Sequence, residues 1–189
     1  TTTGLATLVA EELDADWSRV KVDFAPADRE KYKNLFWGVQ GTGGSTAIAN
    51  SFMQYRTAGA AARELLVRAA AQEWGVDASD ITVSDGILTS GSKQGSFGDF
   101  VFQAVELTPV ENPPMKSPDQ FKLIGKQVLL RKDSVSKTDG TAVFAMDVKL
   151  PGMVYAAIQR SPRFGGVVKS FDMTAAKQVG GFIDAKALP

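Results

Sequence analysis

A glycine-rich turn followed by a long alanine-rich segment constrains the fold of this chain more than any other feature. The turn reads Gln-Gly-Thr-Gly-Gly-Ser-Thr over residues 40–46, and apolar side chains then recur at helical spacing through residue 74. Glycine lets the backbone take positive φ and approach a ligand closely. A side-chain oxygen of Ser45 or Thr46 can accept from the free N–H groups of a first helical turn. We therefore expect a long helix that begins at a tight turn.

The same turn can serve as an anion site. Backbone N–H groups at the positive end of a helix dipole attract negative charge, and phosphate is their commonest guest. We hypothesise that the turn holds the phosphate-bearing part of a large cofactor, although a plain helix cap is the commoner use of such a turn. Two phosphate motifs are excluded: no Lys-Ser/Thr pair stands where a P-loop needs it, and Thr46 replaces the third glycine or alanine of the dinucleotide fingerprint.

Composition excludes several classes of site. Lys plus Arg and Asp plus Glu are both 21 in 189 residues, so no charge excess favours nucleic acid. The chain has no cysteine, which excludes a disulfide framework, an iron–sulfur cluster and a thiolate nucleophile. It has no histidine, which excludes a Ser-His-Asp triad and a histidine base and, with no cysteine, a structural zinc site. We find no signal peptide and no apolar run long enough to span a membrane.

Local patterns predict the elements of the first half. Apolar spacing predicts a helix at residues 5–13, alternation predicts a half-buried strand at Val20–Phe24, and Asp85-Gly86 predicts a type I′ turn between two short strands. Ser96 with Asp99 three residues later predicts the start of a short helix. Two further expectations concern packing. The small residues around Gly59 are expected to meet a sheet closely, and the aromatics Tyr32, Phe36 and Trp37 are expected to lie in the nearest core.

The second half is expected to form a separate small domain. Residues 109–118, with two adjacent prolines at their centre, are typical of an extended linker. Beyond it we expect a polar turn at residues 133–140 and then a small α+β unit with strands and one short helix, at residues 143–148, 153–159, 166–172, 173–178 (the helix) and 181–185.

Several short motifs in this second half resemble one known domain. They are Arg131-Lys132-Asp133, the run from Lys137 to Ala142, Asp147, Leu150-Pro151-Gly152-Met153-Val154-Tyr155, Arg160-Ser161-Pro162 and Val168-Lys169-Ser170-Phe171-Asp172. Together they resemble the α/β hammerhead domain of the molybdenum hydroxylases, the xanthine dehydrogenase and aldehyde oxidase family. Residues 1–74 resemble the large-subunit segment that follows that family's Gly-Gln-Gly cofactor loop. A cofactor-binding segment ahead of the hammerhead resembles the molybdopterin-binding large subunit of the isoquinoline 1-oxidoreductase beta and aldehyde dehydrogenase type.

The resemblance implies a fold and a domain order. The fold class is α+β: an α/β cofactor-binding subdomain with one long helix, followed by the hammerhead. Residues 1–108 would be part of the molybdopterin-binding domain, residues 109–122 the linker, and residues 123–189 a hammerhead truncated at its C-terminus. The chain would be an N-terminal fragment of the large subunit.

The resemblance also implies a function. The family oxidises aldehydes or hydroxylates N-heterocycles with water as the oxygen source. It implies a molybdenum-bearing molybdopterin cofactor in the full-length subunit, in the cytosine dinucleotide form, a small 2Fe-2S partner subunit and a cytochrome c subunit. It implies a periplasmic location, with the cytoplasm as the alternative, and no nucleic-acid partner or direct membrane span.

Site residues follow from the same resemblance. Gly43, Gly44, Ser45 and Thr46 match the family's cofactor-contacting turn, with the N–H of Gly44 near the metal ligands and Ser45 contacting the pterin. Ala47 stands where some relatives carry a second serine. No residue matches a metal ligand or the family's catalytic glutamate, so the fragment by itself is expected to be inactive. The chain's glutamates outside that turn are expected to be solvated, among them Glu11, Glu12, Glu64, Glu73, Glu106 and Glu111.

A second class of function stays open. The chain would also suit a noncatalytic interaction or assembly domain that keeps the same fold. Exposed strand edges would let the fragment pair with a second copy as a homodimer. Phe36 and Trp37 are the only local candidates for a substrate wall, and the substrate itself is not legible.

Overall fold

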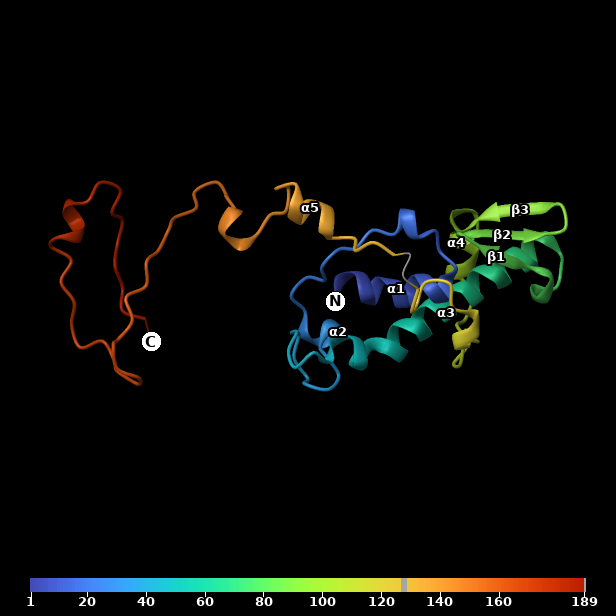
Figure 1. Cartoon of the computed structure of the whole chain (residues 1–189), viewed down its shortest axis with the longest axis horizontal. Coiled ribbons are helices and arrows are strands. Elements are labelled where there is room, and N and C mark those ends of the chain that lie inside the picture. The colour runs from blue at the N-terminus through green and yellow to red at the C-terminus, as the bar shows by residue number, and fades with distance from the viewer. Residues whose placement is uncertain (127–128, 189) are drawn as a thin grey trace. The chain divides into compact units, whose positions relative to one another are not determined.

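The computed structural model describes residues 1–126 and 129–188, and its contacts divide into two compact units (Figure 1). The first unit is Thr1–Ala142 and the second begins at Val143. The α-helices are α1 (Thr2–Leu13), α2 (Arg29–Tyr32), α3 (Thr46–Trp74), α4 (Phe97–Val105) and α5 (Ser134–Thr138). The strands are β1 (Thr82–Ser84), β2 (Ile87–Ser90) and β3 (Lys93–Ser96), and five 3₁₀ turns are η1 (Trp17–Arg19), η2 (Ala78–Asp80), η3 (Pro118–Gln120), η4 (Ala145–Asp147) and η5 (Ala176–Gln178).

Helices α1 and α3 lie side by side and form the frame of the first unit (Figure 1). They approach most closely at Gly59, where an added Cβ would lie 2.7 Å from the carbonyl oxygen of Val9 and 3.0 Å from Cβ of Glu12. The prediction of a close contact at Gly59 is confirmed, but its partner is wrong: the neighbour is a helix and not a sheet. Glycine is required there because any side chain would separate the two helices.

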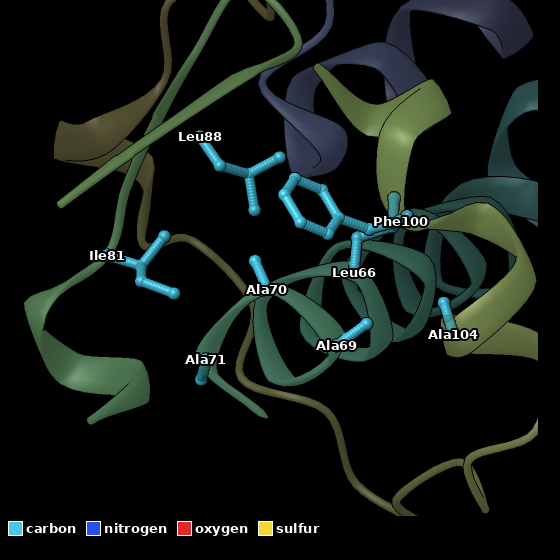
Figure 2. Packing of buried hydrophobic residues seen from close by; sticks show 8 residues of the cluster. All are labelled: Leu66, Ala69, Ala70, Ala71, Ile81, Leu88, Phe100 and Ala104. Atoms are coloured by element: carbon cyan, nitrogen blue, oxygen red, sulfur yellow. The ribbon is translucent and has the colours of Figure 1, made fainter. Parts of the chain in front are cut away.

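The core of this unit lies at the C-terminal half of α3. Figure 2 shows Leu66, Ala69, Ala70 and Ala71 of α3 facing side chains from the loop before β1, from β2 and from α4. Those side chains are Ile81, Leu88, Phe100 and Ala104. Gly95 of β3 leaves room for the ring of Phe100, since an added Cβ would lie 2.7 Å from the ring. Trp74 closes the end of the cluster with its ring edge-on to Phe100 at 5.2 Å.

The three strands form one antiparallel sheet in the order β1-β2-β3. Asp85 and Gly86 have φ of 51° and 75°, so both central residues of the first turn are left-handed and the predicted type I′ hairpin is confirmed. Strand β3 was not predicted. The start of α4 is confirmed as well, because the Asp99 carboxylate accepts from both the N–H and the hydroxyl of Ser96.

The other expected strands do not form. Val20–Phe24 is not a strand, and from Val143 to Leu188 the regular structure is limited to η4 and η5, with no buried residue. In that described stretch the backbone hydrogen bonds join residues only three or four positions apart, as in turns. A strand exists only when another strand completes its ladder, and the alternating pattern alone supplies no such partner. The α+β class is therefore correct for the chain, through the small sheet, whereas the hammerhead stays a prediction.

The expected linker also differs in its surroundings. Pro113 and Lys116 are buried, and the segment that contains them lies against α1 within the first unit. The polar turn expected at residues 133–140 contains the short helix α5. The division of the chain at residues 109–122 into two domains stays a prediction.

The Gly59 contact leads to a stability prediction. Gly59→Ala should destabilise the chain by about 1–3 kcal/mol in urea unfolding, because the methyl group forces α1 away from α3. At an exposed helical position the same change would stabilise it. Ala58→Leu is the control, since Ala58 is exposed on the same helix and its larger side chain points into solvent. Equal unfolding midpoints for the two variants would contradict the close approach.

Candidate functional site

The glycine turn lies at the start of α3, as predicted. Gly44 and Ser45 both have φ of 55°, so two consecutive residues are left-handed, one of them without the freedom of glycine. Residues 41–45 are exposed. Ser45 takes the N-cap position but its hydroxyl makes no capping hydrogen bond, and Thr46 Oγ donates to the carbonyl of Gly43 at 2.9 Å. The expectation that Ser45 or Thr46 caps the helix with its side chain is therefore wrong.

Without a side-chain cap, the turn keeps its backbone donors free. The N–H groups of Gly43, Gly44 and Ser45 have no acceptor among the described residues, while the N–H of Thr46 donates to Gly43 at 3.1 Å. These groups lie at the positive end of a 29-residue helix. The turn thus has the donors that the anion-site hypothesis requires.

A network of side chains holds the neighbouring loop against the turn. Trp37 donates from its indole N–H to Thr46 Oγ at 3.1 Å. The buried amide of Asn34 accepts from the backbone N–H groups of Phe36 and Trp37 at 2.9 and 3.2 Å, and Asn50 of α3 also accepts from Phe36 at 3.1 Å. Because this network fixes the backbone of the loop, it also fixes where the two aromatic rings lie.

These aromatic side chains are exposed. Phe36 is 73% exposed, Trp37 53% and Tyr32 45%, so the expectation that they lie in a core is wrong. The two rings of Phe36 and Trp37 meet edge to face at 5.1 Å. An added Cβ at Gly44 would lie 3.6 Å from the Trp37 ring, so the indole covers one side of the turn.

A cleft of about 720 Å³ lies next to the turn. Its walls are the apolar face of α1, the segment 20–25, and the start of α3 from Ala47 to Tyr55. Gln40, Gly41 and Thr42 line it, whereas the four predicted residues from Gly43 to Thr46 do not. The structure therefore brings the first half of the glycine-rich sequence to the cleft and leaves the free N–H groups outside it.

Sequence reasoning was wrong about two carboxylates. Glu11 and Glu12 of α1 were expected to be solvated, but they are 1% and 0% exposed. Both lie three or four residues after the buried Leu8, which is the spacing of one helix face. That spacing was the available signal, although it could not reveal the cationic partners.

Glu12 pairs with Arg56 across the two frame helices. Its carboxylate accepts from Arg56 Nε at 2.7 Å and Nη2 at 2.6 Å, and its other oxygen accepts from the backbone N–H of Lys116 at 2.9 Å. Arg56 also donates to the carbonyl of Lys116 and lies between the rings of Phe52 and Phe121, 5.3 and 5.0 Å from their centroids. The pair is buried and its hydrogen bonds are satisfied, so it is structural and not a free catalytic group.

Glu11 binds the segment that follows. Its carboxylate accepts from three successive backbone N–H groups, those of Lys122, Leu123 and Ile124, at 2.6–3.1 Å. The ammonium group of Lys116 bridges Glu11 at 3.0 Å and Asp14 at 2.8 Å. Burial acts to raise the pKa of Glu11 and of Asp14, but these hydrogen bonds outweigh it and lower both pKa values below their ordinary range.

The described residues contain no cluster of three or more acidic side chains placed to hold a metal ion. In the same part of the chain no helix combines the length and the apolar character needed to cross a membrane. Helix α3 is long enough, but Arg56, Arg63, Glu64 and Arg68 interrupt it.

Comparison with known proteins identifies the family. No family model matches the chain. It is 36% identical over 187 residues to a membrane-bound aldehyde dehydrogenase [pyrroloquinoline-quinone] of Gluconacetobacter polyoxogenes, a match that covers 96% of this chain and 23% of that protein. It is 34% identical over 223 residues to the beta subunit of isoquinoline 1-oxidoreductase from Brevundimonas diminuta, covering 99% of this chain and 28% of that one. A nicotinate dehydrogenase subunit of Pseudomonas putida is 27% identical over 86% of this chain and 13% of its own length.

These matches extend over nearly the whole chain. Over the segment that it shares with these oxidoreductases, the chain belongs to the molybdenum hydroxylase family, as the sequence motifs predicted. The chain spans about a quarter of the length of the first two relatives. The comparisons test neither the predicted cofactor turn nor the predicted domain boundaries, which stay predictions.

The buried ion pair predicts a large mutational effect. Glu12→Gln should destabilise the chain by about 3–5 kcal/mol, because it leaves the Arg56 charge buried without a counter-charge. The free energy of unfolding from urea titration measures it. Glu106→Gln is the matched control, since Glu106 is exposed and its loss should change stability by less than about 0.5 kcal/mol. A similar small effect at both positions would contradict the ion pair.

The lowered pKa values predict acid sensitivity. Glu11 and Asp14 have folded-state pKa values below those of the unfolded chain, so their contribution is complete above the unfolded values and is lost as pH falls. Stability should therefore decrease on acidification from about pH 5. Glu11→Gln should make this decrease shallower, while Glu111→Gln, at an exposed position, should leave its slope unchanged. Parallel pH profiles for the native chain and Glu11→Gln would exclude Glu11 as a cause.

Proposed function

We propose that this chain is part of the large subunit of a molybdenum-dependent oxidoreductase that oxidises aldehydes or hydroxylates N-heterocycles with oxygen from water. The observation that carries the proposal is the match of nearly the whole chain to proteins named as an aldehyde dehydrogenase and an isoquinoline oxidoreductase subunit. Within this proposal, residues 123–189 form the hammerhead domain and residues 1–108 part of the cofactor-binding domain.

The residues of the glycine turn fit an anionic cofactor. Three backbone donors at the start of α3, those of Gly43, Gly44 and Ser45, have no acceptor in the described structure, and Gly44 has no side chain to block an approach. These donors would hold oxygen atoms of a molybdopterin, and Thr46 would orient the Trp37 ring beside them through the bond at 3.1 Å. When bound, the molybdenum centre would accept the electrons of substrate oxidation.

The chain's own carboxylates do not supply the base. Abstraction of a proton needs a carboxylate that can reach the reacting atoms, yet Glu11 and Glu12 are buried in bonds to Lys116, Arg56 and backbone groups. Glu64 pairs with Arg68 along α3. We therefore propose that the base lies in polypeptide outside the matched segment and that the isolated chain is inactive.

The name of one relative favours a different cofactor. The aldehyde dehydrogenase of Gluconacetobacter polyoxogenes carries pyrroloquinoline-quinone in its name. That quinone and molybdopterin both carry anionic groups, so free N–H donors alone do not separate them. Molybdopterin, in its cytosine dinucleotide form, is our proposal because the beta subunit of isoquinoline 1-oxidoreductase matches almost equally well and over nearly all of this chain.

Partners and location belong to the same proposal. Two relatives are named as subunits, which supports an assembly of more than one chain. We propose a small 2Fe-2S subunit that receives the electrons, a cytochrome c subunit that passes them on, and a periplasmic location.

Metal analysis of the gene product, purified from its own host, tests the cofactor. We expect close to one molybdenum per large chain and no pyrroloquinoline quinone, measured by elemental analysis and by chromatography of the released cofactor. Gly44→Val should lower the molybdenum content at least about tenfold, because a side chain would enter the site of the bound oxygen atoms.

A second glycine controls for backbone strain. Gly91, in the turn between β2 and β3, has φ of 59° and free space around it, so Gly91→Val imposes a similar strained backbone away from the turn. It should leave the molybdenum content unchanged. Equal loss in both variants would refute a role for Gly44, and a protein with the quinone and no molybdenum would refute the proposed function.

A further inference from the structure

Residues Val20–Ala25 form an unpaired edge on the first unit. Val20 has a β-region backbone with φ of −65° and ψ of 121°, and none of the six residues has positive φ. Within the described part of the chain, the N–H groups of residues 21–25 donate no hydrogen bond. The segment also borders the cleft of about 720 Å³ beside α1. It carries the sequence of a strand without the ladder that a strand requires.

The side chains of this edge alternate in character. Val20 and Val22 are half-buried, whereas Lys21 and Asp23 are exposed, which is the pattern of a strand with one wet face. Phe24 follows on the apolar side but is 88% exposed. Burial of that ring and completion of the backbone ladder would both favour pairing with another strand.

The sequence of the edge is complementary to itself. In an antiparallel pair related by a two-fold axis at Val22, Lys21 of each copy lies opposite Asp23 of the other and Val20 lies opposite Phe24. The other in-phase centres bring like charges together, Lys21 on Lys21 or Asp23 on Asp23. A shift by one residue would turn the apolar side chains to the wrong face. One register alone satisfies both charge and polarity.

We propose that this edge is a homodimer interface, in which residues 20–24 of two copies pair as antiparallel strands about Val22. A two-fold interface of this kind uses the same surface on both copies. Two Lys–Asp pairs and two Val–Phe pairs then flank a central Val–Val pair. This association does not depend on the cofactor proposed above.

Charge reversal tests the register. Sedimentation equilibrium of the 189-residue chain should show a reversible monomer–dimer equilibrium. Lys21→Asp and Asp23→Lys should each raise the dissociation constant at least about tenfold, because each turns two attractive pairs into repulsive ones. The double variant Lys21→Asp/Asp23→Lys restores opposite charges and should return within about threefold of the native value. Lys149→Asp, at an exposed position of the second unit, controls for net charge.

Cross-linking gives a second measurement that does not rely on affinity. The chain has no cysteine, so a single introduced thiol can react only with its copy. Val22→Cys places two thiols directly opposite, within the Cβ separation of about 4.5–5.5 Å that suits a disulfide. Val20→Cys places them about 13 Å apart along the strands, too far to join. Rapid oxidation to a covalent dimer is therefore expected for Val22→Cys and not for Val20→Cys.

Several results would overturn the proposal. A monomer at all concentrations would refute it, as would a dimer whose affinity ignores the charge reversals. Equal cross-linking at residues 20 and 22 would place the interface elsewhere. If the polypeptide that the longer relatives carry outside the matched segment binds this edge and abolishes the dimer, the edge is an internal strand of a larger subunit and the proposal is wrong.

Discussion

The buried pair of Glu12 and Arg56 is the interaction on which the first unit depends. It joins α1 to α3 and, through the backbone of Lys116, joins both helices to a segment about a hundred residues further along the chain. Removing charges from water is costly, and here full hydrogen bonding and the rings of Phe52 and Phe121 offset that cost. Gly59 makes the arrangement possible, because only glycine lets the helices come close enough for the pair to form.

The same frame separates the candidate site from the core. Helix α3 carries the glycine turn at its start and the apolar cluster from Leu66 onward, about 30 Å further along the helix at 1.5 Å per residue. The turn therefore receives no support from the main core. Its conformation depends on local hydrogen bonds from Asn34, Trp37 and Thr46, and this explains why exposed aromatic side chains lie there.

Features with local causes could be predicted from the sequence. The hairpin follows from Asp85-Gly86, and the start of α4 follows from Ser96 and Asp99 three residues apart. Features with distant causes could not. Glu11 looked solvated because its partners, Lys116 and the backbone of residues 122–124, are more than a hundred positions away. Val20–Phe24 alternates like a strand, but a strand also needs a neighbour, and alternation does not supply one.

By itself the sequence determined where the helices and the hairpin form, and its motifs indicated the molybdenum hydroxylase family. These depend on backbone preferences and residue patterns carried within short stretches. Tertiary structure alone decided that α1 and not a sheet packs on Gly59, that Glu11 and Glu12 are buried, and that the glycine turn and Trp37 stay exposed. The reason is physical: burial depends on which distant groups meet, and a carboxylate can leave water only where cations and N–H groups from elsewhere in the chain converge on it.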